Sequence, residues 1–406
     1  MKIGMVLDNV FPPDPRVENE AVELIKNNCE VFLFCLNYGV DKKQEIINKI
    51  QVRRYKSNGF EYKMSALAYS LPIYTFLMQK KIRHFIEKNN IEVLHIHDIR
   101  IAQAAFKANK NKLPTVLDLH ENRPEIMRYY PHMQKLTGKL LISIKKWKQK
   151  EECFIKKASK VVVVSQQAKQ EIVDRVGVAY DKITVAPNTV REAFFKDDNN
   201  FEIPYQKSNK EFTLLYLGDT GNRRGLETVL NGMLILNGQI KNLKFVVVGK
   251  VNLEFKNKIN RLGLTKQVKL LGWQNDTSFP SWIKIADVCL CPLHRNIHHD
   301  TTYANKIFQY MSIGKPLLVS NAKAQKEIVE RVQAGLVHEA ENASDFSKKL
   351  LTLYQHKELR ELLGQNGKEF VEKQFTWSKT SKDLINMYKQ LNKREIPKVT
   401  FKKSTQ

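Results

Sequence analysis

The sequence predicts an α/β protein made of two doubly wound, Rossmann-like domains that face a cleft. Short, β-branched apolar runs alternate with amphipathic helical patterns along all 406 residues. This alternation is typical of parallel sheets covered by helices on both faces. The chain is also too long for one ordinary core. Because ligands of this architecture bind at the carboxyl ends of the strands, we expect the functional residues there.

The first domain, expected over residues 1–195, contains five strand-like runs. Two lysine-containing segments with apolar faces, 64–90 and 135–160, interrupt the alternation. We expect these segments either to pack on the core or to form a basic surface that rests on an anionic membrane. The five runs are Ile3–Leu7, Val31–Leu36, Val93–His97, Thr115–Leu119 and Val161–Val164.

The second domain, expected over residues 208–374, repeats the pattern. A polar stretch between Val190 and Phe212 precedes it and reads as a linker, and a basic tail is expected over 393–406. Its strand-like runs are Thr213–Gly218, Lys244–Gly249, Val268–Gly272, Asp287–Cys291 and Pro316–Ser320.

The composition points to an anionic partner. Lys and Arg number 67 against 42 Asp and Glu, which leaves a net charge of +25. An acidic membrane face, phosphate-bearing substrates or nucleic acid would each suit that charge. No interleaved aromatic and basic pattern supports nucleic acid. Five cysteines without zinc-type spacing, no signal peptide and no apolar run of membrane-spanning length favour the cytoplasm.

A glycine-rich turn is the first stretch that carries chemistry. "YLGDTGNRRGLETVL" (Tyr216–Leu230) reads as a strand, a turn with Gly218, Gly221 and Gly225, and a helix. Its spacing is neither the dinucleotide fingerprint nor a Walker loop, which argues against a nicotinamide dehydrogenase and against a P-loop enzyme. Glycines beside Arg223 and Arg224, just ahead of a helix N-terminus, suit a diphosphate.

A second helix start lies in "DTTYANKIFQYMSIGKPLLVS" (Asp300–Ser320). A polar loop leads into a short helix and then a buried strand, so the helix N-terminus opens beside the sheet as an anion site. The polar residues at its mouth are Thr301, Thr302, Asn305, Lys306 and Gln309.

Histidines gather at other predicted strand ends. His95 and His97 point to one face of their strand, either into the core or into the cleft, and His120 ends a strand at the expected cleft. "HRNIHHD" (His294–Asp300) resembles a metal cluster. Because Pro292 and Asn296 indicate a loop there, we expect no metal.

Taken in order, these stretches resemble family 4 glycosyltransferases. The resemblance also includes "DNVFPPDPRVENEAVEL", "VLDLHENRPE", "EECFIKKASKVVVVS", "VVVGK", "VKLLGWQNDTSFPSWIKIADVCLCPL" and "EIVERVQAGLVHE". It implies the GT-B fold, a nucleotide-diphosphate sugar held mainly by the second domain, and an acceptor on the first. It also implies metal-independent transfer with retained configuration and no cofactor. "FTWSKTSKDLINMY" is similar to the helix, expected over 375–392, that crosses back to the first domain.

The resemblance assigns roles to single residues. His120 falls on the catalytic histidine that faces the donor sugar, and Arg224 on the basic residue that holds the diphosphate. Donor contacts are implied for Gly221, Arg223, Lys250, Trp273 (at the base), Thr301, Thr302, Asn305, Lys306 and Gln309.

Two departures accompany the resemblance. A second basic residue of the family falls on Asp219, and Lys306 or Arg16 is the candidate replacement in donor binding. The family's paired glutamates fall on Thr301 and Gln309, whose side chains can still hydrogen-bond hydroxyls.

We therefore expect a hexosyltransferase of surface polysaccharide or lipid-linked glycan synthesis, cytoplasmic or peripheral on the inner membrane face. A soluble acceptor is the alternative within this class. The alternative of another class is a non-catalytic nucleotide-sugar-binding subunit of a glycosyltransferase complex.

Overall fold

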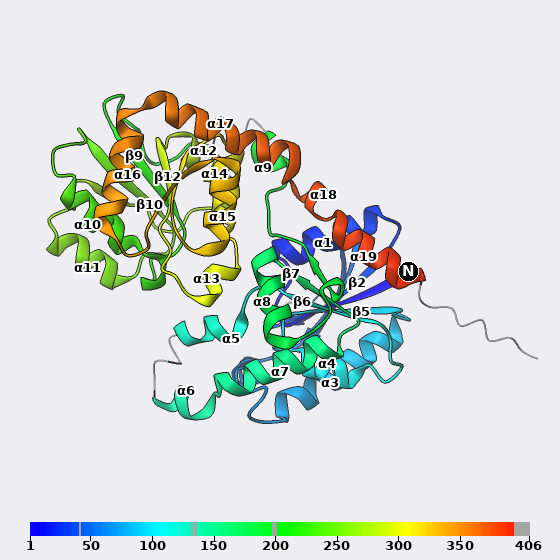
Figure 1. Ribbon diagram of the computed structural model, residues 1–406. Coiled ribbons are helices and arrows are strands. Elements are labelled where there is room, and N and C mark those ends of the chain that lie inside the picture. Colours follow the sequence, from blue (N-terminus) through cyan, green and yellow to red (C-terminus); the bar gives the residue numbers. More distant parts are fainter. Residues whose placement is uncertain (40–41, 131–132, 134–135, 197–200, 394–406) are drawn as a thin grey trace, which may run out of the picture. The chain divides into compact units, whose positions relative to one another are not determined.

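The chain forms two compact α/β units (Figure 1). A computed structural model describes residues 1–406 except 40–41, 131–132, 134–135, 197–200 and 394–406. The first unit contains Met1–Val164, Lys169–Ala186 and the chain from Ser381 onward, and the second contains Ser165–Ala168 and Pro187–Thr380. The predicted fold class is confirmed, whereas the predicted basic tail lies outside the described residues apart from Lys393.

The first unit is built on an eight-stranded sheet with the order β3-β4-β2-β1-β5-β6-β7-β8. All neighbours are parallel except β3 and β4. The chain places β2 and β4 on one side of β1 and β5 on the other, so the strand order reverses between β1 and β5. The strands are β1 (Lys2–Leu7), β2 (Glu30–Asn37), β3 (Gln44–Ile47), β4 (Ile50–Lys56), β5 (Val93–His97), β6 (Thr115–Leu119), β7 (Lys160–Val163) and β8 (Ile183–Val185).

Helices cover both faces of this sheet because the strands are apolar on both sides. Ile3 and Met5 of β1 share a buried core with α1 (Pro15–Lys26) and α19 (Lys382–Lys393). A Cβ at Gly4 would meet Phe85 of α3 (Ile73–Lys88), which covers the opposite face. The other helices of four or more residues between α1 and β8 are α2 (Gly59–Ser65), α4 (Ala102–Ala108), α5 (Arg123–Ile126), α6 (Leu136–Leu141), α7 (Ile144–Lys157) and α8 (Gln166–Val176).

The two helices of the lysine-rich segment 135–160 differ in burial. In α7, Trp147 and Phe154 are buried, so this helix packs on the core. In α6, Leu136, Leu140 and Leu141 are 75%, 78% and 57% exposed. Within the described part of this segment, α7 therefore packs on the core, whereas α6 leaves apolar side chains exposed.

The second unit is built on a parallel six-stranded sheet with the order β11-β10-β9-β12-β13-β14. The order reverses between β9 and β12, which is where ligands bind in open parallel sheets. The strands are β9 (Phe212–Leu217), β10 (Leu243–Val248), β11 (Val268–Leu270), β12 (Val288–Cys291), β13 (Leu317–Ser320) and β14 (Gly335–His338).

Alternate residues of β9 face two separate cores of this unit. Leu214 and Tyr216 pack with α10 (Leu226–Ile235) and α16 (Ala343–Gln355), whereas Leu215 and Leu217 pack with α12 (Phe279–Lys284), α14 (Asn305–Ser312) and α15 (Lys323–Val332). The helices are α9 (Ala193–Lys196), α10 (Leu226–Ile235), α11 (Leu253–Arg261), α12 (Phe279–Lys284), α13 (Ile297–Thr301), α14 (Asn305–Ser312), α15 (Lys323–Val332), α16 (Ala343–Gln355), α17 (Lys357–Gln374) and α18 (Trp377–Thr380).

The division between the units differs from the predicted one. Phe194, Phe195 and Tyr205 of the expected linker pack against a core of the second unit, so that unit begins at Pro187 rather than 208. The predicted helix 375–392 is split: α18 belongs to the second unit and α19 to the first. Within the described residues, no helix has both the length and the apolar character needed to cross a membrane.

Candidate functional site

The glycine turn of the second unit lies where the strand order reverses. It follows β9 and ends at Gly225, whose φ of 72° favours glycine. A Cβ at Gly225 would lie 1.7 Å from the carbonyl oxygen of Pro292, in the loop after β12. The amide of His294 also donates to the carbonyl of Arg223 at 3.0 Å. The two loops that leave β9 and β12 are therefore held together.

Arg224 projects from this turn and is paired within it. Its guanidinium lies 2.6 Å from the Asp219 carboxylate. Although burial raises the pKa of Asp219, the hydrogen bond and charge of Arg224 hold it at about 2. Asp219 Oδ1 also accepts from the Gly221 amide at 3.1 Å, which shapes the turn. The residue expected to hold a diphosphate is thus already opposite a carboxylate.

Lys306 brings a further charge to the turn from α14. Its ammonium lies 3.7 Å from the ring centroid of Tyr216 and 2.8 Å from where a Cβ of Gly218 would be. Burial lowers the pKa of Lys306 to about 7, and the positive charge of Arg224 acts in the same direction. Because no side chain caps the N-terminus of α14 in the described residues, its first amides are available to an anion.

Arg223 lies on the other side of the turn, toward α13. Its Nη1 is 3.5 Å from Nε2 of His299, and burial lowers the pKa of His299 to about 4. The expected loop around His294–Asp300 contains this short helix, which Asn296 caps by accepting from the His299 amide. His299 is thus a neutral partner of Arg223.

The remaining residues predicted to bind the donor differ in their exposure to solvent. Trp273, 77% exposed, and Lys250 follow β11 and β10, whose loops are joined by a 2.7 Å hydrogen bond from the Gly249 amide to the Gly272 carbonyl. Asn305 is exposed, while Thr302 and Gln309 are half-buried.

Thr301 is the exception among these residues. Its side chain is buried, and its hydroxyl donates to Ile297 of its own helix at 2.7 Å. The structure therefore gives it a local structural contact in place of the expected donor contact.

In the first unit, polar side chains gather at the carboxyl ends of β5 and β6. His120 follows β6, and its Nε2 lies 3.2 Å from Oδ2 of Asp118 and 3.0 Å from Nδ1 of His97. Its side chain is 20% exposed, and Nδ1 has no hydrogen-bond partner among the residues described. His120 thus offers one ring nitrogen to a ligand and uses the other for internal contacts.

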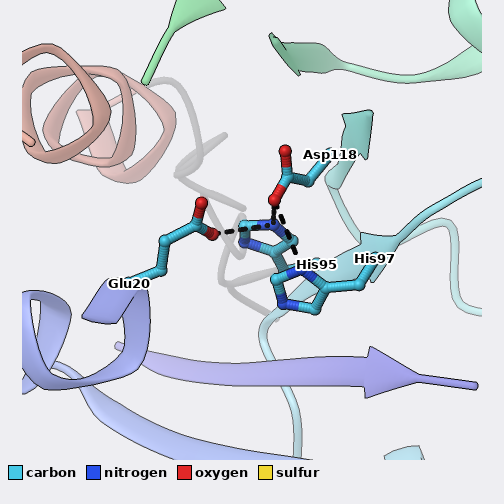
Figure 2. Close-up of side chains that lie close together, drawn as sticks. All are labelled: Glu20, His95, His97 and Asp118. Carbon is cyan, nitrogen blue, oxygen red and sulfur yellow. Dashed lines mark ion pairs between the residues drawn. The ribbon is translucent and has the colours of Figure 1, made fainter. Parts of the chain in front are cut away.

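A buried cluster lies behind His120. Glu20 of α1, His95 and His97 of β5, and Asp118 of β6 point toward one another (Figure 2). His95 Nε2 is 3.5 Å from Glu20 Oε2 and 3.8 Å from Asp118 Oδ2, and His97 Nδ1 is 3.3 Å from Asp118 Oδ2. The two histidine rings stack at 4.3 Å. Both histidines therefore lie in the core rather than open to solvent.

Arg16 belongs to this cluster, which corrects the expectation that it contacts the donor. It is 7% exposed and donates from Nε and Nη2 to the two oxygens of Asp118 at 2.9 and 2.7 Å. Its Nη2 also lies 3.0 Å from Glu20, and its Nη1 donates to the carbonyl of Ala186. Arg16 is committed to the carboxylates because it lies one helical turn before Glu20 and opposite Asp118.

The charges of the cluster favour a protonated His120. Burial raises the pKa of Asp118, but Arg16 and His120 lower it well below its usual value. Burial lowers the pKa of His120, but the charge and hydrogen bond of Asp118 raise it above its usual value. Burial also raises the pKa of Glu20 and lowers those of His95 and His97.

This cluster has a metal-like set of side chains. The ligating atoms of Glu20, His95, His97 and Asp118 lie within 4.8 Å of one another. However, the guanidinium of Arg16 already contacts both carboxylates and would repel a second cation. Both oxygens of Glu20 and Nε2 of His95 and His97 are buried without a hydrogen-bond partner among the described residues, so the cluster is held chiefly by the ion pairs of Arg16. Because that internal cation occupies the carboxylates, we assign no metal to the cluster.

Several of these contacts were not predicted from the sequence. Asp219 was noted as a departure but not as the partner of Arg224, and Tyr216 was not expected under Lys306. Glu20 could have been found from its spacing of four after Arg16, and Asp118 from its shared strand face with His120. Tyr388 of α19, whose hydroxyl lies 2.5 Å from Nδ1 of His95, had no local signal.

Each of the two units matches a known glycosyltransferase family. The family "Glycosyl transferases group 1" matches residues 197–370, and "Glycosyltransferase Family 4" matches residues 16–194.

Individual proteins similar to this chain are also named as glycosyltransferases. The capsular polysaccharide biosynthesis glycosyltransferase CapM of Staphylococcus aureus is 22% identical over 73% of this chain and 85% of its own length. An uncharacterized glycosyltransferase of Methanocaldococcus jannaschii is 22% identical over 96% of this chain and 98% of its own.

Solved structures share the fold. Sucrose-phosphate synthase of Thermosynechococcus elongatus superposes with a TM-score of 0.76 at 15% identity, covering 97% of this chain and 100% of that one. Anabaena HepE in complex with UDP superposes with a TM-score of 0.68 at 15% identity, covering 96% and 100%.

Proposed function

Because this chain is a family 4 glycosyltransferase with the GT-B fold, we propose that it moves a hexosyl group, with retained configuration, from a nucleotide-diphosphate sugar to an acceptor hydroxyl. The observation that carries this proposal is the convergence of Arg223, Arg224 and Lys306 on one glycine turn. Negative charge grows on the diphosphate as its bond to the sugar breaks. Fixed cations and the free amides of α14 would stabilise that charge.

The first donors to test are UDP-sugars. HepE, which shares the fold, was solved with UDP. Trp273, on the loop beside that of Gly249, offers an exposed ring on which a base could stack. Gln309 would accept from one ribose hydroxyl and donate to the other. Asn305, Thr302 and Lys250 complete the proposed donor contacts.

His120 would act at the sugar end of the donor. Its Nδ1 is the ring nitrogen left over by its contacts with Asp118 and His97, and Asp118 favours its protonated form. A protonated imidazole can donate a hydrogen bond to a sugar hydroxyl and so hold the sugar in place while its bond to the diphosphate breaks. We also propose that transfer needs no metal ion, because side chains and backbone amides would neutralise the diphosphate.

We place the reaction in surface polysaccharide or lipid-linked glycan synthesis, on the cytoplasmic side. The CapM relative carries a capsular polysaccharide function in its name. The net charge of +25 and the three exposed leucines of α6 would suit peripheral binding to an anionic membrane.

One observation favours a second candidate, a non-catalytic nucleotide-sugar-binding subunit. The family's acidic pair falls on Gln309, which carries no charge, and on Thr301, whose hydroxyl is turned into its own helix. Such a subunit would bind donor without turning it over.

A donor panel separates the two candidates. Release of UDP or GDP from a set of nucleotide sugars, with and without glycan acceptors, would be compared for the native chain and His120→Ala. We expect His120→Ala to lose most turnover and keep its affinity for UDP, because the nucleotide contacts are proposed for the second unit. His84→Ala, an exposed histidine of the same unit, should behave as the native chain. Tight UDP binding without release from any donor would favour the subunit instead.

A further inference from the structure

The C-terminal helix reaches the histidine cluster through one tyrosine. Tyr388 of α19 is 2% exposed, and its hydroxyl lies 2.5 Å from Nδ1 of His95, which has no exposed surface. The two rings also stack at 6.1 Å. These residues are 293 positions apart in the sequence. The contact therefore exists only because α19 packs on the first unit.

The chemistry of the neighbours sets the direction of this hydrogen bond. Burial lowers the pKa of His95, so its ring is neutral and has one N–H. Its Nε2 faces the carboxylates of Glu20 and Asp118 at 3.5 and 3.8 Å. Asp118, whose pKa lies well below its usual value, is ionised and can only accept a hydrogen bond, so the proton belongs on Nε2 and Nδ1 is the acceptor. The Tyr388 hydroxyl is then the donor.

Asp118 links His95 to His120. Its Oδ2 accepts from Arg16 at 2.9 Å, faces His95 on one side and lies 3.2 Å from Nε2 of His120 on the other. The carboxylate has no exposed surface, and His97 Nδ1 also lies 3.3 Å from Oδ2, so its orientation depends on these buried neighbours. A change in which nitrogen of His95 carries the proton would therefore alter the orientation and the pKa of His120.

We propose that Tyr388 and His95 are positioning residues for His120: the tyrosine hydroxyl fixes the His95 proton on the nitrogen that faces Asp118, and the carboxylate so oriented holds His120. Neither residue touches the substrate. The catalytic consequence rests on the proposed function, whereas the link between Tyr388 and the protonation of His120 does not.

The direction of the effect follows from the groups that face His120. These are Asp118 from β6, His97 and Asp98 from β5 and its end, and Arg16 from α1. Without the tyrosine hydroxyl, His95 is free to turn a lone pair toward Asp118. Asp118 then faces a lone pair in place of an N–H at 3.8 Å, so less of its negative charge is offset and that charge acts more strongly on His120. The pKa of His120 should rise further.

The test that needs no turnover is an NMR titration of His120, assigned with His120→Gln. Tyr388→Phe removes only the hydroxyl and should shift the His120 titration upward by roughly half a pH unit. Tyr55→Phe is the matched control, because Tyr55 is a partly buried tyrosine of the same unit that packs on Phe34 and Phe85. An unchanged His120 titration in folded Tyr388→Phe would overturn the proposal.

Kinetics on the donor found by the panel form the second arm. Tyr388→Phe should lower kcat about threefold to tenfold because His120 is held less firmly, although more of it is protonated, and the pH profile should move upward in step with the titration, with UDP affinity unchanged. A shifted titration with native kcat and pH profile would overturn the positioning role. If no donor is turned over, the proposed function fails, and the titration alone decides whether Tyr388 governs His120.

A double-mutant cycle guards against a purely structural effect. In His95→Gln, the side chain offers an amide N–H to the carboxylates. An amide has no tautomers, so it needs no hydrogen bond from Tyr388 to keep that proton in place. In a His95→Gln background, Tyr388→Phe should have little further effect on kcat or on the His120 titration. Fully additive effects would show that the tyrosine acts by another route and would overturn the proposed chain of contacts.

Discussion

Two of the three guanidinium nitrogens of Arg224 contact the same oxygen of Asp219: Nε and Nη2 lie 2.9 and 2.6 Å from Oδ2. A diphosphate that binds at this turn must replace that carboxylate or share the guanidinium with it. Asp219 thus keeps Arg224 in place while the site is empty and competes with the ligand when it arrives.

Asp219→Asn should therefore raise affinity for UDP. The amide keeps the Oδ1 acceptor for the Gly221 amide, so the turn is retained, while the negative charge beside the diphosphate is removed. We expect UDP to bind severalfold more tightly by calorimetry, with the gain largest at low ionic strength. Weaker binding would mean that Asp219 chiefly orders Arg224 for the ligand.

Arg224→Ala should lower turnover by about 10²–10³, the usual scale for the loss of one pre-placed donor to a developing charge. Arg261→Ala, an exposed arginine of α11 in the same unit, is the control for a general loss of positive charge. Steady-state kinetics on both variants check this. Equal kcat in Arg224→Ala and Arg261→Ala would remove Arg224 from the proposed chemistry.

Gln309 should act as a binding residue. An amide contributes about 0.5–1.5 kcal/mol per neutral hydrogen bond, less than a carboxylate would. Gln309→Ala should raise the KM for the donor severalfold with a smaller change in kcat, because a ribose contact is similar in the ground and transition states. Gln309→Glu should keep activity. Unchanged donor affinity in Gln309→Ala would make Gln309 a plain helix residue.

The exposed leucines of α6 should support membrane binding. Replacing Leu140 and Leu141 with serine removes two apolar side chains that are 78% and 57% exposed. We expect this variant to sediment less with phosphatidylglycerol vesicles, and salt to weaken binding of the native chain. Leu362→Ser, at a 58% exposed leucine of α17, is the control. Equal sedimentation of all three proteins would exclude α6 as the contact.

Features set by local pattern could be predicted from the sequence. The apolar runs predicted five of the eight strands of the first sheet and five of the six of the second, because strands buried on two faces are continuously hydrophobic. The runs did not include β3, β4, β8 or β14. The glycine turn and the start of α14 were placed correctly, since glycine spacing and the following apolar positions signal them locally. Gly225 additionally has a φ of 72° and close contact with Pro292, which explains the need for glycine there.

Features set by distant partners could not be predicted. Arg16 looked like a spare cation for a diphosphate, but its partner Asp118 lies 102 residues away and meets it only in the folded sheet. The polar stretch after Val190 looked like a linker, yet its aromatic residues find a core on the second unit. Thr301 was expected to contact the ligand, but its hydroxyl donates to the Ile297 carbonyl in its own helix. That contact could not be predicted without knowing that α13 begins at Ile297.

The last prediction concerns Lys306, whose pKa burial lowers to about 7. Below that pH the ammonium is already charged, whereas above it most molecules carry a neutral amine. A bound diphosphate favours the charged form, so binding above pH 7 must take up a proton. Affinity for UDP should then fall as pH rises from 7.5 to 9, by at most about tenfold per pH unit. The terminal phosphate is fully ionised over that range, since its second pKa is about 6.

Calorimetry in buffers of different ionisation enthalpy measures this uptake directly, and we expect nearly one proton per UDP at pH 8.5. Lys306→Arg keeps a charge that does not titrate in this range, so its UDP affinity should not depend on pH. Lys306→Met should bind UDP weakly at every pH, while Lys256→Met, at an exposed lysine of α11, should behave as the native chain. If the native chain took up no proton and its affinity stayed constant from pH 7.5 to 9, Lys306 would not face the diphosphate. The charge would then have to come from Arg223 and Arg224 alone.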